Sequence, residues 1–155
     1  MQISDTLLQR LMEMEGCRLV AYRDQNGVPT IGYGHTHGVR MGDRISPQQA
    51  REWLRQDATE VMLQVRRLHV ARTEAQLEAL TSFAFNVGIG RLKQSTLLKT
   101  IRQGCSKQAI QREFKRWVYV GGRKLPGLVA RRQWEVEHFF APSYATDDEI
   151  VDRVL

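Results

Sequence analysis

Two carboxyl side chains and a hydroxyl occur close together near the start of the chain. Glu15 is followed nine residues later by Asp24, and Thr30 comes six residues after that, in the stretch EGCRLVAYRDQNGVPTIGYGHTH from Glu15 to His37. Two carboxyl groups on opposite sides of a sugar can cleave a glycosidic bond. The hydroxyl of Thr30 could hold the attacking water, so these three side chains supply the minimum set of groups that such a reaction needs.

A helix is expected to position the first carboxyl. Apolar residues recur at helical spacing from Ile3 to Met14, Ser4 or Asp5 can cap the helix start, and Gly16 is a typical helix stop. Glu15 then lies at the helix C-terminus. The carbonyl groups there disfavour a negative charge, which suits a proton donor.

A small antiparallel sheet of two or three strands is expected to position the other two groups. Short apolar segments lie on both sides of Asn26-Gly27 within residues 18–37, and this dipeptide favours a hairpin turn. Asp24 would lie at the turn and Thr30 in the strand that follows it.

The rest of the chain predicts helices and an α+β, mostly helical fold. Their expected ranges are 46–68, 73–86, 95–103, 106–117 and 128–140, with a loop at the glycines and proline of 121–127. The first of them, some 20 residues long, would span about 30 Å and connect two lobes. We expect one domain at 1–142, with lobes at about 13–60 and at 1–12 plus 61–142, a groove between them, and a polar acidic tail at 143–155.

Charge and composition limit the function classes. The net charge is +6, and residues 1–145 carry 22 Lys+Arg against 13 Asp+Glu, or +9. Such a surface attracts a polyanion, either nucleic acid or an anionic bacterial envelope. The sequence has no zinc finger, helix-turn-helix signature or phosphate-binding glycine loop, so specific nucleic-acid binding is not expected.

Cysteine and histidine spacing suggests neither a disulfide framework nor a metal site. Cys17 and Cys105 are 88 positions apart, which favours two free thiols made in a reducing compartment, with a single bridge or a redox role of Cys17 as alternatives. His35 and His37 have no acidic or cysteine partner at metal-ligand spacing.

The sequence suggests neither an export signal nor a membrane span. The first residues lack a basic region followed by an apolar run, and no stretch approaches 18 apolar residues. We therefore expect a protein made in the bacterial cytoplasm that needs another route to any substrate outside it.

Three blocks of this sequence resemble the phage-type lysozymes, glycoside hydrolase family 24. They are Glu15, Asp24 and Thr30 with IGYGHT, then SFAFNVGIGRLKQSTLLK at 82–99, then RWVYVGGRKLPGLVARRQWEVEHF at 116–139. The likeness extends over roughly residues 5–140, leaves the tail without a counterpart, and implies a lysozyme-like fold.

The resemblance implies cleavage of the β-1,4 bond between N-acetylmuramic acid and N-acetylglucosamine in bacterial peptidoglycan. Glu15 matches the general acid, and Asp24 and Thr30 match the groups that bind and activate water on the opposite sugar face. The family is described as inverting, although retention stays open, as does the role of the aspartate as base or electrostatic support. This chemistry needs no metal or organic cofactor.

The resemblance also implies groove residues. The positions that align with sugar contacts are Thr36, Phe85, Ser95 and Gln111. Asn86 beside Phe85 could hydrogen-bond an N-acetyl group. Of Arg131 and Arg132, we expect one to face the cleft and the other to be solvated.

His35 admits two interpretations. Its place among glycines would suit a catalytic base, but we expect a structural histidine near the site, paired with a carboxylate on the long helix such as Asp57.

The resemblance suggests the biological setting. We expect a monomer that acts on the cell wall in the periplasm, after export through a holin or a secretion system. A phage, a prophage or a secreted-effector origin would fit equally. The alternative function is a catalytically weak peptidoglycan-binding module of the same fold.

Overall fold

The computed structural model describes residues 1–142, and the expected acidic tail at 143–155 lies outside these residues. Backbone packing divides the chain into two compact units, Met1–Glu60 and the part from Val61 onward. Residues 1–12, which we expected in the helical lobe, fall in the first unit. The expected groove between the lobes stays a prediction.

The first unit begins with helix α1 (Asp5–Met14). The Ser4 hydroxyl caps it by accepting from the Leu7 amide at 3.1 Å, as the sequence predicted. Leu7, Leu8 and Leu11 are fully buried on one face, which explains why this short helix is stable.

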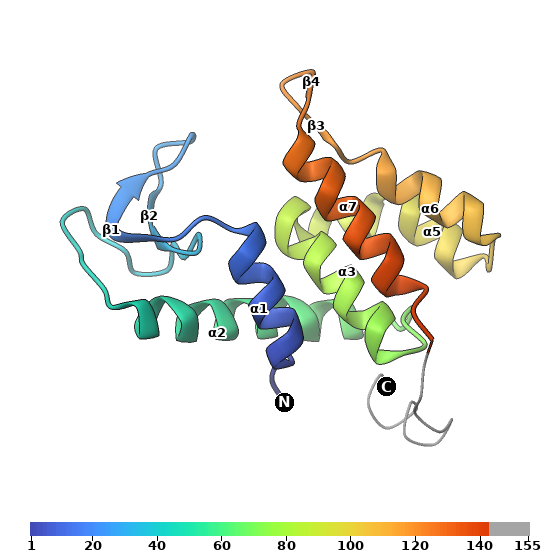
Figure 1. Cartoon of the computed structure of the whole chain (residues 1–155), viewed down its shortest axis with the longest axis horizontal. Coiled ribbons are helices and arrows are strands. Elements are labelled where there is room, and N and C mark those ends of the chain that lie inside the picture. The colour runs from blue at the N-terminus through green and yellow to red at the C-terminus, as the bar shows by residue number, and fades with distance from the viewer. Residues whose placement is uncertain (143–155) are drawn as a thin grey trace. The chain divides into compact units, whose positions relative to one another are not determined.

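A hairpin of β1 (Arg18–Arg23) and β2 (Pro29–Gly32) follows α1, as Figure 1 shows. The strands are antiparallel, with Tyr22 opposite Thr30, and Gly27 in the loop has a φ of 78° that suits glycine. The segment near Arg44 adds a single bridge to Val20 of β1. This arrangement agrees with the expectation of two or three strands.

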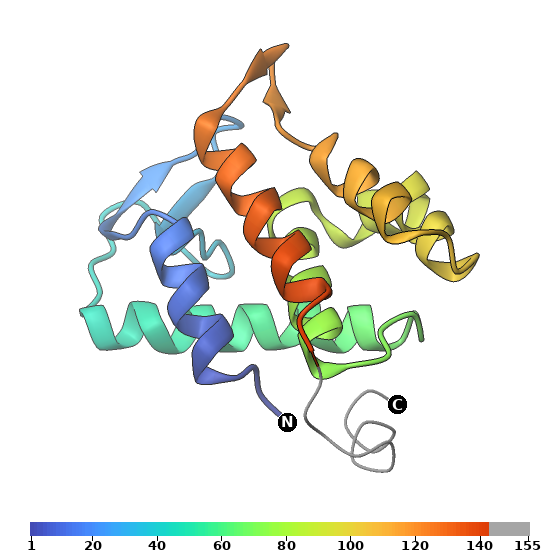
Figure 2. The same ribbon diagram turned by 45° about the vertical axis from the view of Figure 1, so that its right-hand side comes forward.

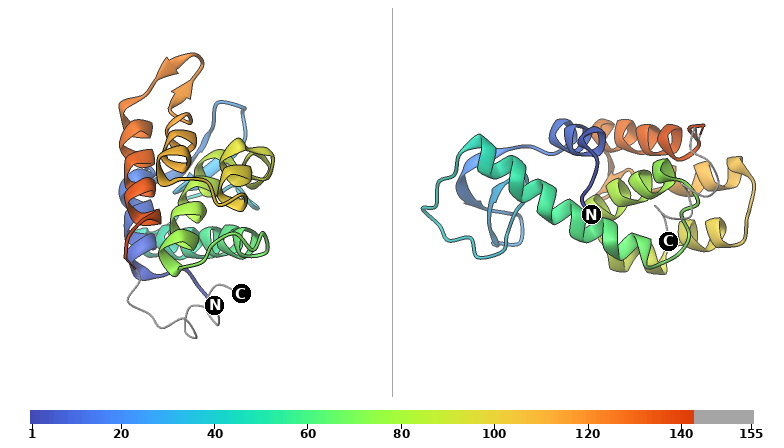
Figure 3. Two further views of the ribbon diagram at one scale, coloured as in Figure 1. Left: turned by 90° about the vertical axis from the view of Figure 1, so that its right-hand side faces the viewer. Right: turned by 90° about the horizontal axis from the view of Figure 1, so that it is seen from below.

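The long helix α2 (Pro47–Arg66) runs from the first unit into the second and is seen along its length in Figure 3. The Ser46 hydroxyl accepts from the Gln49 amide at 3.1 Å and caps its start. The helix ends two residues earlier than the sequence predicted.

Five helices make up most of the second unit: α3 (Glu74–Val87), α4 (Ile89–Gln94), α5 (Thr96–Arg102), α6 (Lys107–Lys115) and α7 (Pro126–Phe139). α3 and α7 lie side by side, and α5 packs on α6 (Figures 1 and 2). The hydroxyls of Thr73, Ser95 and Ser106 cap α3, α5 and α6, and each is the first residue of a range in which the sequence predicted a helix. The sequence did not predict α4.

An aromatic cluster forms the centre of the second unit. The Phe83 ring on α3 meets Phe114 on α6 edge-on at 5.7 Å and Trp117 at 5.4 Å, and Phe114 meets Phe139 on α7 at 5.6 Å. These edge-to-face contacts bind α3, α6 and α7 together.

A second hairpin, of β3 (Tyr119–Val120) and β4 (Arg123–Lys124), corrects the expected loop before α7. Gly121 and Gly122 connect the strands and both have positive φ, at 56° and 78°. A two-residue hairpin turn of this kind requires positive φ at both central residues, and two glycines supply it without strain.

Candidate functional site

Glu15 forms the C-cap of α1. Its amide donates to the Leu11 carbonyl at 2.8 Å, while its own backbone is extended, with φ −96° and ψ 136°. The half-buried side chain therefore leaves the chain where the helix ends and the path to β1 begins. This is the helix-end position that the sequence predicted.

Asp24 lies in the loop of the first hairpin, and one of its carboxylate oxygens organises that loop. Oδ1 accepts from the amides of Asn26 at 2.8 Å and Val28 at 2.9 Å. The side chain is thereby fixed through one oxygen, and Oδ2 is the atom that it can offer to a ligand or a water.

Thr30 is held beside Asp24 by the backbone of Val28. The carbonyl of Val28 accepts from the Asp24 amide at 3.0 Å and from the Thr30 hydroxyl at 2.8 Å. Because Thr30 Oγ1 gives its hydrogen to Val28, the oxygen can only accept from a further partner. The hairpin thus holds a half-buried carboxylate and a buried hydroxyl, 3% exposed, on the backbone carbonyl of one residue.

His35 is locked in the way the sequence predicted. Its Nδ1 lies 2.8 Å from Oδ2 of Asp57 on α2, its Nε2 lies 3.0 Å from the carbonyl oxygen of His37, and its ring packs on Trp53 at 4.4 Å. The pairing with Asp57 is confirmed. Thr36 lies exposed in the same turn.

The second unit places Phe85 and Asn86 on the last turn of α3, with Phe85 half-buried and Asn86 exposed. The Asn86 side-chain oxygen accepts from Nη2 of Arg132 at 2.6 Å. Asn86 is therefore hydrogen-bonded to α7, a contact that the sequence did not predict.

Arg131 and Arg132 are both buried, at 5% and 0% exposed. This corrects the expectation that one of them faces the cleft and the other is solvated. The carboxylate of Glu135 balances them: Oε1 lies 2.8 Å from Nε of Arg132, and Oε2 lies 3.6 Å from Nε of Arg131. Glu135 follows the two arginines by four and three residues, a helical ion-pair spacing that the sequence displayed and that could have identified the group.

Full burial of Glu135 and partial burial of Tyr33 shift the pKa values of these two side chains. Burial raises the pKa of Glu135 from an ordinary 4.5 to about 7, against the opposing attraction of Arg132 and Arg131 and the hydrogen bond from Ser82. Burial, followed by the nearby Cys17 thiol, raises the pKa of Tyr33 in the first unit. Cys17 and Cys105 are both free and exposed.

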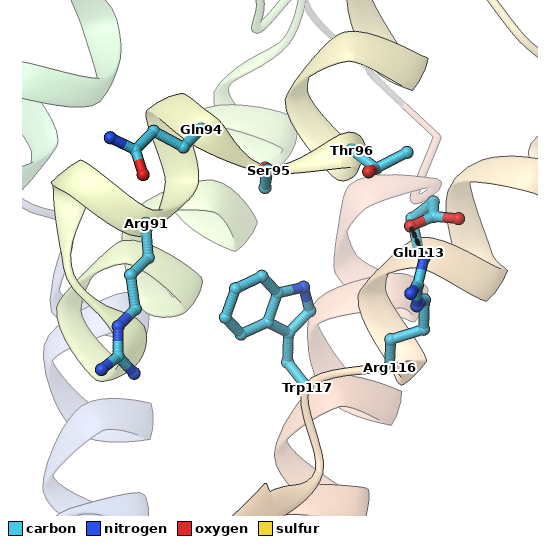
Figure 4. Close-up of a pocket in the computed structure, with 7 residues that line it drawn as sticks. All are labelled: Arg91, Gln94, Ser95, Thr96, Glu113, Arg116 and Trp117. Carbon is cyan, nitrogen blue, oxygen red and sulfur yellow. Dashed lines mark hydrogen bonds and ion pairs between the residues drawn. The ribbon is translucent and has the colours of Figure 1, made fainter.

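A cavity of about 450 Å³ opens in the second unit (Figure 4). Its walls are formed by Arg91, Gln94, Ser95, Thr96, Glu113, Arg116 and Trp117. The Trp117 ring lies between the two arginines, of which Arg116 pairs with Glu113 at 3.2 Å. The cavity is thus rich in hydrogen-bond donors and has one aromatic ring, that of the half-buried Trp117, in its wall.

Ser95 lines this cavity, but its hydroxyl is already hydrogen-bonded to the backbone. It donates to the Leu92 carbonyl at 2.7 Å and accepts from the Leu98 amide at 3.0 Å as the cap of α5. Gln111, half-buried on α6, is not among the residues that form the cavity wall. A sugar contact at either residue stays a prediction.

The described part of the chain holds no group of three or more His, Cys, Asp or Glu side chains arranged for a metal ion. Within residues 1–142, no helix combines the length and the apolar character needed to cross a membrane.

The helix-end glutamate and the hairpin aspartate are two carboxyl side chains, the type of group that glycoside hydrolases use in pairs. The model of the phage lysozyme family matches residues 12–135, so this chain belongs to that family. The family resemblance noted in the sequence is therefore confirmed.

Individual relatives agree with this assignment. The chain is 39% identical over 140 residues to an endolysin of Acyrthosiphon pisum secondary endosymbiont phage 1, covering 87% of this chain and 95% of that protein. It is 40% identical over 142 residues to an endolysin of Bacillus phage B103, covering 87% of this chain but only 52% of that longer protein.

Among solved structures, the muramidase domain of SpmX from Asticaccaulis excentricus matches with a TM-score of 0.82 and 32% identity, over 90% of this chain and 98% of that one. The chain therefore has a lysozyme-like fold, as the sequence predicted.

Proposed function

We propose that this member of the phage lysozyme family is a muramidase, which hydrolyses the β-1,4 bond between N-acetylmuramic acid and N-acetylglucosamine in bacterial peptidoglycan. The observation that carries the proposal is the pair of acceptors on the first hairpin. Asp24 accepts from the Val28 amide and the Thr30 hydroxyl donates to the Val28 carbonyl, and this supports the proposal that Oδ2 of Asp24 and Oγ1 of Thr30 bind one water. The endolysin and muramidase names of the relatives support the same reading.

Each group has a defined task in this mechanism. Glu15 protonates the glycosidic oxygen, so that the leaving sugar departs as a neutral alcohol. Asp24 and Thr30 hold the water that attacks the anomeric carbon from the opposite face, and Asp24 takes up its proton. This route inverts the anomeric configuration.

Further residues are proposed to bind the glycan. Thr36 of the first unit and the second-unit residues Phe85, Asn86, Ser95 and Gln111 contact sugar, while His35 supports the turn that carries Thr36. No metal or organic cofactor takes part, because carboxyl groups and water suffice for this reaction.

The setting is part of the proposal. Residues 1–142 act as a single lysozyme-like domain of two lobes, the protein works as a monomer, and it reaches the periplasmic cell wall through a holin or a secretion system. Peptidoglycan, and no specific nucleic acid, is its partner.

The test is the release of reducing ends from purified peptidoglycan, with product masses recorded. We expect the wild type to release muramic acid reducing ends and Glu15→Gln to be slower by about 10²–10⁴-fold, the usual effect of losing a general acid. Glu13→Gln, on the exposed side of α1 where Glu13 pairs with Arg10, is the matched control and keeps full activity.

Two outcomes would decide against this proposal. Release of non-muramic reducing ends would assign a different bond. Binding of the cell wall without cleavage by the wild type would favour the alternative, a catalytically weak peptidoglycan-binding module of the same fold. NMR detection of the first-formed anomer separates inversion from retention.

A further inference from the structure

The exposed side chain of Asn86 has a fixed polarity. Its Oδ1 lies 2.6 Å from Nη2 of Arg132. A guanidinium has only donors, so the amide atom that faces it must be the oxygen. The amide nitrogen of Asn86 then points away from Arg132 and carries two hydrogens, and within residues 1–142 it has no hydrogen-bond acceptor.

Arg132 cannot turn to release Asn86 without losing other interactions. Its Nε lies 2.8 Å from Oε1 of Glu135, and its Nη2 lies 3.3 Å from Oε2 of the same residue. The guanidinium also lies over the Phe83 ring, 4.9 Å from its centre, and the side chain is completely buried. Contacts on α3 and α7 therefore fix its orientation.

Glu135 is held in turn from two helices. Ser82 on α3 donates its hydroxyl hydrogen to Oε2 at 2.7 Å, and Arg131 on α7 donates to the Ser82 carbonyl at 2.9 Å. Every link from Ser82 to Asn86 is thus a hydrogen bond or ion pair between buried groups, until the chain of contacts reaches the surface at the Asn86 amide.

Stability alone does not account for this arrangement. Replacing a buried ionic cluster by apolar residues is often neutral or stabilising, because desolvation offsets the attraction between the charges. The cluster ends at the exposed side-chain amide of Asn86, whose oxygen is hydrogen-bonded to Arg132 and whose nitrogen can donate to a ligand. A binding group held rigidly by buried neighbours is typical of a recognition site.

We propose that Arg132 and Glu135 are positioning residues that fix Asn86 as a hydrogen-bond donor to the acetamido carbonyl oxygen of a bound N-acetylated sugar. The inference rests on the proposed function, since that function makes an N-acetylated glycan the ligand. It adds which atom of Asn86 recognises the sugar and which residues orient it.

The first test uses ligands that differ only at this group. Tri-N-acetylchitotriose and cellotriose are both neutral trisaccharides, with acetamido groups in the first where the second has hydroxyls. Titrations followed by NMR give the affinity of each for the full-length protein. We expect the wild type to prefer the acetylated sugar.

The decisive variant is Asn86→Asp. An aspartate still accepts from Arg132, so the fold is kept and the melting temperature stays equal or rises. It no longer donates a hydrogen, so affinity for tri-N-acetylchitotriose falls about tenfold or more, whereas affinity for cellotriose does not. Gln108→Glu, an exposed amide-to-acid change at the start of α6, controls for the added charge and leaves both affinities unchanged.

Arg132→Lys tests the positioning role, because lysine keeps the charge but loses the planar fork. We expect Arg132→Lys to lower the preference for the acetylated sugar. The double variant Arg132→Lys with Asn86→Asp should lose no more of this preference than Asn86→Asp loses alone. Equal binding by the wild type and Asn86→Asp would overturn the donor assignment. Fully additive losses in the double variant would overturn the coupling.

These binding data are independent of cleavage. If the wild type cleaves peptidoglycan, and Asn86→Asp binds tri-N-acetylchitotriose with the same affinity as the wild type, this inference fails and the proposed function stands. If the wild type releases no reducing ends but shows the expected ligand preference, the proposed function fails and the assignment of Asn86 stands as a sugar-recognition group.

Discussion

Asp57 and His35 form a side-chain pair that ties the turn after the first hairpin to the long helix α2, with 2.8 Å between Oδ2 and Nδ1. The other ring nitrogen of His35 lies 3.0 Å from the carbonyl oxygen of His37. One imidazole therefore connects a helix and a loop, and both nitrogens are occupied. A histidine engaged in this way has no free nitrogen with which to exchange a proton with a substrate.

The first prediction concerns this pair. Asp57→Ala should lower the free energy of unfolding by about 1–2 kcal/mol, because it leaves Nδ1 of a mostly buried ring without its partner. Cleavage by the folded protein should persist below the melting transition. Denaturant unfolding and peptidoglycan assays at low temperature test both points, and a variant of normal stability without activity would assign His35 to the chemistry.

The second prediction separates the two oxygens of Asp24. Asp24→Asn keeps an oxygen for the amides of Asn26 and Val28, so its melting temperature should stay near that of the wild type. The amide group presents no charge to the water, and kcat should fall by about 10²-fold or more.

Asp24→Ala should lose activity and also about 1–2 kcal/mol of stability, because the loop amides lose their acceptor. Asp43→Asn is the matched control, since Asp43 accepts from the Arg40 amide in another turn of the same unit. If Asp24→Asn kept its activity, a structural role alone would suffice for Asp24.

The third prediction concerns the hydroxyl of Thr30. Thr30→Ser keeps a hydroxyl that can donate to the Val28 carbonyl and accept from water, so most activity should remain. Thr30→Val keeps the shape but has no acceptor, and kcat should fall by about tenfold or more. Thr59→Val is the control: Thr59 accepts from the Ile3 amide, so its loss should cost stability but no activity.

The sequence predicted features that depend on local chemistry. Ser4 caps a helix as expected, and Thr73, Ser95 and Ser106 cap helices at the residues where the predicted ranges begin, because a hydroxyl before a helical run satisfies amides of the first turn wherever that helix packs. The first hairpin likewise follows from Asn26-Gly27, whose preference for a turn is local.

Features that depend on tertiary packing were harder to predict. Arg131 and Arg132 looked like surface cations, and their burial depends on Ser82, which reaches Glu135 from another helix 53 residues away in sequence. Charge and hydrophobicity along the chain do not report such distant partners.

The fourth prediction is a pH dependence of stability that originates at Glu135. Its pKa is about 7 in the folded protein against an ordinary 4.5, so between these pH values the folded state retains a proton that the unfolded state has released. The contribution of Glu135 to the free energy of unfolding is therefore fully present below about pH 4.5 and is lost as the pH rises through 7. The loss is at most about 3 kcal/mol.

Glu135→Gln resembles the protonated form at every pH and should remove this dependence. The stability difference between wild type and variant, measured by urea unfolding from pH 4.5 to 8, should shift in favour of the variant as the pH rises. Glu137→Gln, at an exposed site on the same helix, should show no such trend. A difference that shifts toward the wild type would mean that the attraction of Arg131 and Arg132 outweighs burial, and that the cluster is a stabilising ion pair throughout this range.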